Sequence, residues 1–179
     1  MTTIKTIRET PNYVLRKFAT LISLNIYGLQ KYKVLEPSAG SGRIADMIKD
    51  FDYCVESLTC VELNNDLCNI LKEKGFNTIH SDFLNYNTDN TEKFDIIVAA
   101  PPFKGNIDLK HIMHMYDMLS ESGFIISLTS PYWLTNNEPL QVDFRAFISN
   151  KRYTLELLPD DTFVEKGKTV PTAILFIEK

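Results

Sequence analysis

The chain has 179 residues, of which 44% are apolar and 23% charged, and its net charge at pH 7 is −4. This length fits one domain with a full hydrophobic core, and seven Gly and eight Pro are too few for a collagen-like or low-complexity chain. No uncharged apolar run reaches the roughly 18 residues of a membrane span. The first twelve residues contain no apolar signal-peptide core, so we expect a cytoplasmic protein.

Apolar runs alternate with helical patterns along the chain, which predicts an α/β sheet of mainly parallel strands. A first helix is expected to begin at Thr10 as N-cap and Pro11 as first helical residue, with Val14 opening its apolar face. Strands are expected at 33–36, 58–62, 78–80, 95–99, 124–128, 154–158 and 172–177, the last two as an antiparallel pair. Helices are expected around 44–48, 65–74, 107–119 and 142–148.

The segment Glu36-Pro-Ser-Ala-Gly40-Ser-Gly42 lies between the first strand and the next helix. Glycines let backbone N–H groups approach a ligand, and the following helix adds its positive N-terminus. No Gly-Lys-Ser/Thr follows, so this is not a P-loop, and Ala45 replaces the third glycine of a dinucleotide motif. The segment predicts a ligand-binding turn, with a plain strand-to-helix turn as the alternative.

Acidic residues end the next two predicted strands. Glu62 lies about 20 residues after the glycines, where a carboxylate can accept hydrogen bonds from ribose hydroxyls. Asp82 ends the following strand, where a carboxylate can meet an adenine amino group, and Phe83 can pack beside the ring. Because Glu36, Glu62 and Asp82 all come to the carboxyl edge of one sheet, this edge is the expected binding site.

Ala100-Pro101-Pro102-Phe103, called the tetrad below, follows the fourth strand at the same edge. Two prolines fix the backbone and remove two N–H donors, so the local carbonyls stay free as acceptors. The aromatic ring beside them can stack on a flat substrate. A Pro-Pro pair that only ends a strand is the alternative.

Together these residues resemble the class I S-adenosylmethionine-dependent methyltransferases, and within them the DNA amino-methyltransferases. The match begins at Thr10-Pro11 and ends with the segment Thr162-Phe163…Gly167…Thr172. This last segment resembles small phage- and plasmid-type members. The order of the motifs, with the glycine loop first and the tetrad later, fits the adenine-N6 branch. The resemblance implies a Rossmann-like fold: a mainly parallel seven-stranded sheet with one antiparallel strand and helices on both faces. It also implies one catalytic domain over residues 1–179, without a separate target-recognition domain.

The resemblance implies S-adenosylmethionine as cofactor. The first acidic residue, the glycine loop and the Thr-Pro start would hold its methionine part, Glu62 its ribose, and Asp82 and Phe83 its adenine. The expected cofactor-binding residues are Thr10, Pro11, Glu36, Pro37, Ser38, Ala39, Gly40, Gly42, Glu62, Leu63, Asp82, Phe83 and Ala100. The expected catalytic residues are Ala100, Pro101, Pro102 and Phe103, and the expected substrate contacts are Phe103, Lys104, Tyr132 and Trp133.

Position 100 departs from the family pattern. The family tetrad begins with Asn or Asp in adenine-N6 enzymes and usually with Ser in cytosine-N4 enzymes, whereas alanine offers no side-chain acceptor. Losing one acceptor of a buried amino group costs roughly 1–3 kcal/mol of binding free energy. The loss is larger in the transition state, where charge develops on the nitrogen. The intact remainder of the motifs favours a catalytically impaired variant, engineered rather than natural. Replacement of the acceptor by another residue is the alternative.

The expected substrate is DNA, single- or double-stranded, with RNA as an alternative, and a duplex base must be flipped out. The gaps between the last strands are too short for a recognition domain, so a second copy or a partner protein is expected to supply sequence recognition. Candidate phosphate contacts are Lys104, Lys110, Arg145, Lys151, Arg152, Lys166 and Lys168. Two other functions stay open: a non-catalytic cofactor-binding scaffold or partner subunit, and a protein glutamine amide methyltransferase.

Other reactive residue types indicate core packing. Cys54, Cys60 and Cys68 are odd in number and form no CxxC pair, so reduced, packed thiols are expected. His111 and His114 lie three residues apart without further ligands at metal spacing, so no metal site is expected. Tyr132 and Trp133 either wall the base pocket or pack in the core. The methionines Met113, Met115 and Met118 are expected in the core and on adaptable surface, rather than as part of a cofactor site.

Overall fold

The computed structural model describes residues 9–87, 92–165 and 167–179. The stretch considered for a signal peptide lies largely before these residues, and the phosphate candidate Lys166 lies outside them as well.

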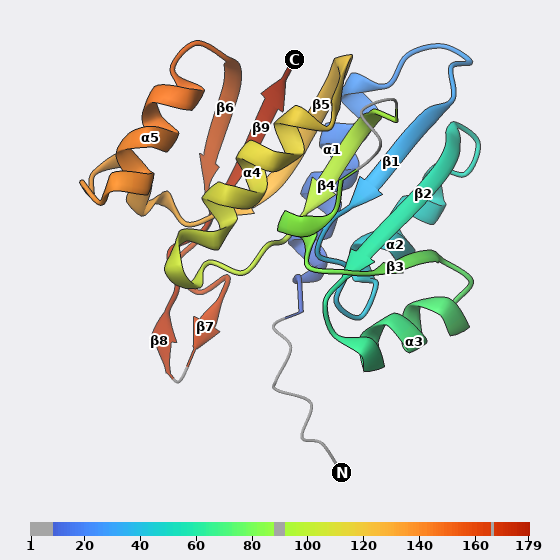
Figure 1. Ribbon diagram of the computed structural model, residues 1–179, viewed down its shortest axis with the longest axis horizontal. Helices are drawn as coiled ribbons and strands as arrows, with labels where there is room; N and C mark the ends of the chain where they lie inside the picture. The colour runs from blue at the N-terminus through green and yellow to red at the C-terminus, as the bar shows by residue number, and fades with distance from the viewer. Residues whose placement is uncertain (1–8, 88–91, 166) are drawn as a thin grey trace.

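One mixed sheet forms the centre of the protein, in the order β3-β2-β1-β4-β5-β9-β6 (Figure 1). β9 runs antiparallel to β5 and β6, and the other neighbouring strands are parallel, as predicted. A short hairpin of β7 and β8, absent from the prediction, forms a second sheet. The strands are β1 (Tyr32–Glu36), β2 (Val55–Glu62), β3 (Asn77–His80), β4 (Phe94–Ala99), β5 (Leu119–Thr129), β6 (Arg152–Leu157), β7 (Val164–Glu165), β8 (Lys168–Thr169) and β9 (Ala173–Glu178).

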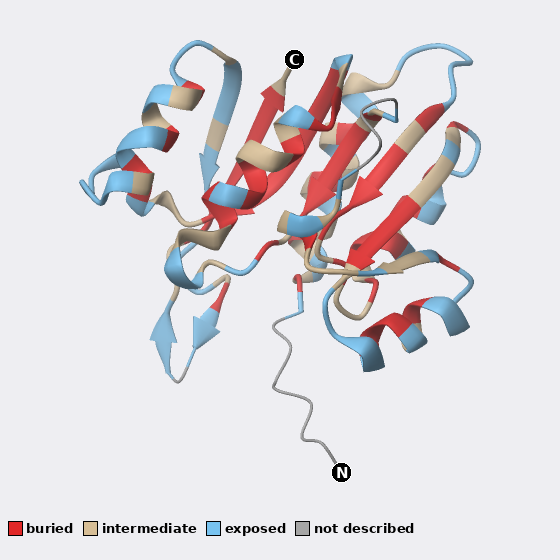
Figure 2. Cartoon of the chain, in the orientation of Figure 1, coloured by how far each residue is buried: buried red, intermediate tan, exposed pale blue. Residues whose placement is uncertain are grey.

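Helices cover both faces of the sheet. α1 (Asn12–Asn25) and α2 (Arg43–Ile48) pack on the face that carries Val34, and α3 (Asn65–Glu73) joins them through Leu71. α4 (Ile107–Asp117) and α5 (Pro139–Ile148) pack on the opposite face, which carries Leu35. Neighbouring strand residues point to opposite faces, so the central strands are buried on both sides (Figure 2). Short 3-10 turns are η1 (Lys49–Phe51), η2 (Phe83–Asn85), η3 (Lys104–Asn106) and η4 (Pro131–Leu134).

Three predicted helix ends are wrong. α5, expected from about residue 142, begins at Pro139, because proline suits the first helical position and Glu138 precedes it as the N-cap. α1 begins at Asn12, because Pro11 has an extended ψ of 150° and its carbonyl accepts the N–H groups of Val14 and Leu15. Thr10 therefore precedes the cap rather than forming it. Leu119 matches the helical spacing of α4, yet α4 ends two residues earlier and Leu119 pairs with Phe94 in the sheet. Sheet pairing and full burial override the helical pattern there.

The expected packing of sulfur-containing residues is confirmed. Cys54, Cys60 and Cys68 are buried and form no disulfide, and burial raises the pKa of the Cys60 thiol. Met115 and Met118 lie in the core between the sheet and α4, whereas Met113 is half-buried and packs against that core. Within the described ranges, no helix is long and apolar enough to cross a membrane.

Candidate active site

Two glycines shape the loop between β1 and α2. Gly40 and Gly42 have φ values of 54° and 84°, a region that residues with a Cβ adopt at a cost. Gly42 is also the N-cap of α2, and a Cβ there would lie 2.8 Å from Leu71 Cδ2 of α3. Glycine at position 42 therefore permits both the turn and the close approach of α3.

The end of β2 holds the glycine loop through Glu62. Its Oε2 accepts the N–H of Gly40 at 2.8 Å, and its Oε1 accepts the N–H of Asn64 at 2.8 Å. Each carboxylate oxygen has a second acceptor site. Glu62 can therefore organise the loop and still accept hydrogen bonds from ligand hydroxyls.

Glu36 lies beneath the loop and is only 1% exposed. Burial raises its pKa well above the usual range, and a hydrogen bond from the Ala45 backbone opposes this only in part. The Sγ of Cys60 lies 4.0 Å from Glu36 Oε2. Because burial favours the neutral acid, Glu36 acts here as a hydrogen-bonding group more than as a charge.

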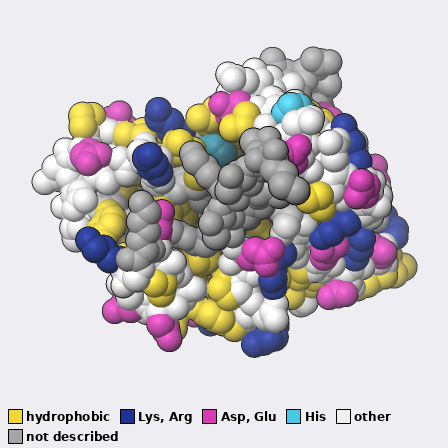
Figure 3. Space-filling model, turned by 90° about the horizontal axis from the view of Figure 1, so that it is seen from below, with side chains coloured by type: hydrophobic (Ala, Val, Ile, Leu, Met, Phe, Trp, Pro, Cys, Tyr) yellow, Lys and Arg dark blue, Asp and Glu magenta, His cyan; other side chains and the backbone are white. Residues whose placement is uncertain are grey.

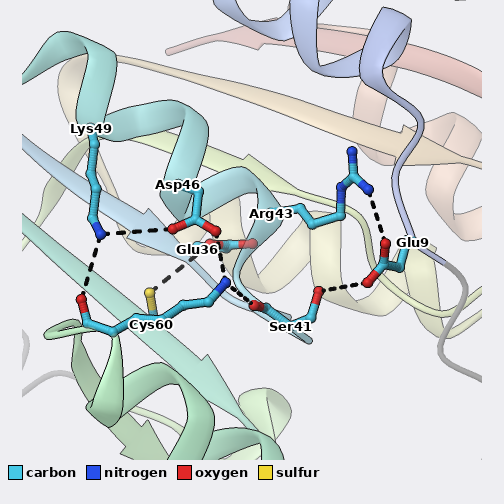
Figure 4. A network of polar contacts seen from close by, with 8 residues as sticks. Glu9, Glu36, Ser41, Arg43, Asp46, Lys49 and Cys60 are labelled. Carbon is cyan, nitrogen blue, oxygen red and sulfur yellow. Dashed lines mark hydrogen bonds and ion pairs between the residues drawn. The ribbon is translucent and has the colours of Figure 1, made fainter.

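Polar contacts fix the chain before α1 across the glycine loop (Figure 4). Glu9 accepts from Ser41 Oγ at 3.2 Å and from Arg43 at 2.9 Å, and the hydrogen bond from Arg43 lowers the pKa of the Glu9 carboxyl. On the other side of the loop, Lys74 donates to the Ser41 carbonyl at 2.7 Å and to Asp46 at 2.7 Å. The loop is thus held from the segment before α1, from α2 and from the C-cap of α3.

A cavity of about 100 Å³ lies where the N-terminal segment, the glycine loop and the tetrad meet. Its presence means that Thr10 and Ala100, far apart in sequence, face the same space as Gly40. The lining residues are Glu9, Thr10, Glu36, Ser38, Ala39, Gly40, Ser41, Arg43, Ile44 and Ala100.

The end of β3 continues the site on the α4 side. Asp82 caps η2 by accepting the N–H of Leu84 at 3.0 Å, and Phe83 is buried. The ring of Phe83 contacts those of His111 and His114, with centroids 5.0 and 4.9 Å away. Leu63, after β2, is 66% exposed.

His111 connects this wall to the glycine loop, because its Nδ1 lies 3.3 Å from Ser38 Oγ. Burial lowers the pKa of His111 to about 4, and His114 adds to this, while Asp82 opposes it. The ring is therefore neutral at pH 7. In the part of the chain that the structure describes, no group of three or more His, Cys, Asp or Glu side chains could hold a metal ion.

The tetrad follows directly on β4. Ala100 is half-buried, Pro101 is buried and Pro102 is exposed. Phe103 is half-buried and packs against the core beneath α1. The tetrad thus starts at the cavity and ends at the surface, where Lys104 is exposed.

Side chains beyond the tetrad fix its far end. Asn106, in the left-handed region at φ 56°, donates to Glu138 at 2.7 Å and accepts from Gln141 at 3.1 Å. Asp108, only 1% exposed, accepts from Thr129 Oγ1 at 2.8 Å and from the N–H of Ser130 at 2.9 Å. Burial raises the pKa of Asp108, and among the described residues its Oδ1 has no hydrogen-bond partner. These contacts tie the tetrad loop to β5 and α5.

The two aromatic residues after β5 have different surroundings. Tyr132 is 52% exposed, so it is accessible to a substrate. Trp133 is 2% exposed and packs edge-on against Phe144, and Arg145 donates to its carbonyl. Of the two roles considered for Trp133, a wall of the base pocket or packing in the core, the structure shows packing in the core.

Some of the candidate phosphate contacts are paired with other groups of the chain, and others are exposed. Lys151 lies over the rings of Tyr116 and Phe147, and Arg152 pairs with Glu178 at 2.8 Å. Both lie at the amino ends of the parallel strands, so the structure contradicts them as contacts for a substrate at the carboxyl edge. Arg145 is occupied by loop carbonyls.

Lys104, Lys110 and Lys168 remain exposed. Figure 3 views the end toward which the parallel strands point, where acidic and basic side chains are interspersed on the surface not drawn in grey. The exposed lysines at this end therefore do not form a continuous basic surface.

Sequence reasoning missed Glu9, Arg43, Asn106 and Asp108, and considered His111 only as a metal ligand. Glu9 had a weak signal, since it immediately precedes the Thr10-Pro11 pair. The others act through partners 21 or more residues away, such as Thr129 for Asp108, which a single sequence does not reveal.

Neither a protein-family model nor a curated protein matches the sequence. Solved structures do match. A Listeria monocytogenes protein proposed to be a class I S-adenosylmethionine-dependent methyltransferase aligns with a TM-score of 0.77 and 16% identity, over 99% of this chain and 63% of that chain. A modification subunit proposed for a type I restriction enzyme of Vibrio vulnificus aligns with a TM-score of 0.74 and 13% identity, over 99% and 45%. The plantazolicin methyltransferase BpumL, solved with SAH, aligns with a TM-score of 0.65 and 10% identity, over 93% and 83%.

The chain has the class I methyltransferase fold. It spans 63% and 45% of the first two of these proteins. The fold prediction made from the strand pattern and the motif resemblance is thereby confirmed.

Proposed function

We propose that this protein binds S-adenosylmethionine at the carboxyl edge of β1, β2 and β3 and transfers a methyl group to the N6 amino group of adenine in DNA. The observation that carries the proposal is the shared cavity, which brings the start of the tetrad next to the glycine loop. The likeness to a type I modification subunit supports DNA as the substrate class.

The residues at this edge suit the proposed cofactor. Glu62 retains acceptor sites for a ribose diol, and Thr10, Ser38 and Gly40 offer polar groups around the cavity for an amino acid part. The buried ring of Phe83 provides an apolar wall for a purine. When bound, the cofactor would supply an electrophilic methyl group on a sulfonium.

The tetrad would then handle the amine. We expect the Pro101 carbonyl to accept one amino hydrogen and Phe103 to stack on the base, a contact worth roughly 1–3 kcal/mol. Ala100 offers no acceptor for the second hydrogen, so the developing charge on nitrogen is under-stabilised. We therefore expect this chain to bind its cofactor and to methylate slowly.

Ala100 also favours a second candidate, a cofactor-binding scaffold or partner subunit without catalysis. Under this alternative the alanine is native, and restoring an acceptor creates no activity. The two candidates agree on cofactor binding and differ on chemistry, so they need separate measurements.

The test compares the chain with Ala100→Asn and with Ala100→Leu, which matches asparagine in size and lacks the acceptor. Calorimetry measures S-adenosylmethionine binding. Single-turnover transfer of labelled methyl is measured on single- and double-stranded adenine-containing DNA, on RNA and on a glutamine-containing peptide, with mass spectrometry of the product. We expect cofactor binding in all three proteins, with similar affinities for the size-matched Ala100→Asn and Ala100→Leu. The rate on DNA should be about 100-fold or more higher for Ala100→Asn than for the other two, by analogy with one oxyanion-hole donor.

Equal, measurable rates for the three proteins would contradict the role of position 100. Binding without transfer in any of them would favour the scaffold. Methylation of the peptide instead of DNA would indicate the glutamine amide alternative, and absence of cofactor binding would contradict the whole proposal.

A further inference from the structure

The edge strand β6 is unusually open for pairing. In the described residues it has a neighbour, β9, on one side only, and it is six residues long, whereas the opposite edge strand β3 has four. Tyr153 and Leu157 are 40% and 63% exposed. Proteins usually protect such edges with short strands, charged side chains, prolines or bulges. β6 contains no proline and its register with β9 is unbroken, so its protection rests on the charges of Arg152 and Glu156.

The hydrogen-bond pattern tells which backbone groups face outward. The N–H of Leu158 donates to the carbonyl of Thr172, which continues the register in which Leu157 lies opposite Ala173. Bonded pairs alternate along an antiparallel ladder, so even-numbered residues of β6 bond β9. Odd-numbered residues, from Tyr153 to Leu157, direct their N–H and C=O groups away from the sheet.

These outward groups restrict how a second copy can pair with β6. In an antiparallel pairing of the strand with itself, only odd-numbered residues can form the bonded pairs. One such register places Tyr153 opposite Leu155 of the second copy, Thr154 opposite its own equivalent, and Arg152 opposite Glu156 of the second copy. Arg152 and Glu156 then form non-bonded pairs, whose side chains approach most closely, and symmetry provides this charge pair twice.

Charges already present in the chain extend this complementarity. Arg152 pairs with Glu178 at 2.8 Å, and Glu156 pairs with Lys17 at 2.6 Å. In the proposed register, each Arg152 lies between two carboxylates and each Glu156 between two cations. A register shifted by two residues places Glu156 opposite Thr154 and loses the charge pair.

We propose that two copies of this chain associate through antiparallel pairing of β6 with β6, in the register that joins Arg152 to Glu156. The twofold axis then crosses the sheet at Thr154, and the two sheets become continuous. The carboxyl edges of the two sheets point in opposite directions, so each copy keeps its own complete site. The proposal goes beyond the proposed methyl transfer and does not depend on it.

Sedimentation velocity between about 1 and 100 μM tests the proposal, with a concentration-dependent dimer expected. Arg152→Glu and Glu156→Arg should each raise the dimer Kd about tenfold or more, because like charges then face each other. Exchanging both charges, with Glu178→Arg and Lys17→Glu added so that the contacts within each copy stay attractive, should return the Kd to within about threefold. Glu73→Arg, a charge reversal on the exposed surface of α3, is the matched control and should leave the Kd unchanged.

Tyr153→Pro gives an independent test, since it removes an outward N–H and leaves the bonds to β9 in place. Circular dichroism and thermal melting confirm that each variant is folded, and calorimetry with S-adenosylmethionine follows the proposed site separately. We expect Tyr153→Pro to be a folded monomer. A wild-type chain that stays monomeric, or a dimer insensitive to Tyr153→Pro, would overturn the interface. Single variants that weaken the dimer without rescue in the charge-exchanged variant, with Glu178→Arg and Lys17→Glu included, would overturn the register.

Discussion

Acidification should destabilise this protein through His111. The side chain is 6% exposed, and burial lowers its pKa from 6.5 to about 4, with Asp82 opposing and His114 adding to the shift. Between these two pH values the unfolded chain binds a proton that the folded chain does not, so stability falls as pH falls. The free energy of unfolding changes by about 1.36 kcal/mol per pH unit for one proton. Lowering the pH from 6.5 to 5 should therefore reduce it by about 2 kcal/mol.

Urea unfolding at pH 7, 6 and 5 measures this effect in the chain and in His111→Gln. Glu36 and Asp108 have raised pKa values, so they stabilise the fold as pH falls and partly mask the trend. Comparing the two proteins at each pH removes that common contribution. Between pH 7 and 5, the free energy of unfolding of the variant should rise by about 2 kcal/mol relative to that of the chain. Parallel profiles for the chain and His111→Gln would refute the reasoning.

Three further outcomes are expected. Glu62→Ala should weaken S-adenosylmethionine binding by about 1–3 kcal/mol in calorimetry, and an unchanged affinity would remove Glu62 from the site. Gly42→Ala should lower the free energy of unfolding by about 1–2 kcal/mol or more, and by more than Gly75→Ala, which has a similar φ but open space around it; equal losses would contradict the packing role. Asp108→Asn should gain stability relative to the chain in urea unfolding as pH rises above 3.8, the ordinary pKa of an Asp carboxyl, because burial raises the pKa of Asp108 in the folded chain; a difference that stays constant from about pH 3.5 to about pH 7 would contradict this.

The sequence predicts the sheet well because its local pattern and its three-dimensional environment agree. Val34 and Leu35 are neighbours, both apolar and both buried on opposite faces, so a short apolar run correctly indicates a strand covered on both sides. Glu62 and Asp82 end their strands where the chain must turn, and parallel strands bring those ends to one edge.

The sequence fails where the deciding partner is distant. Leu119 keeps helical spacing, yet its place is set by pairing with Phe94. Arg152 looks like any surface cation until the topology places it at the amino edge beside Glu178. His111 stands in a helix without a visible partner, and only the fold brings it to Ser38.

The arrangement around position 100 separates cofactor binding from chemistry. The glycine loop is held by Glu62, Glu9 and Lys74, none of which depends on the side chain at position 100. The far end of the tetrad loop is fixed by Asn106 and Asp108, again independently of that side chain. A substitution at position 100 therefore meets a backbone that is anchored on both sides. Because an interaction formed chiefly in the transition state changes turnover more than binding, a deficit caused by Ala100 should be local, and asparagine should reverse it without rebuilding the site.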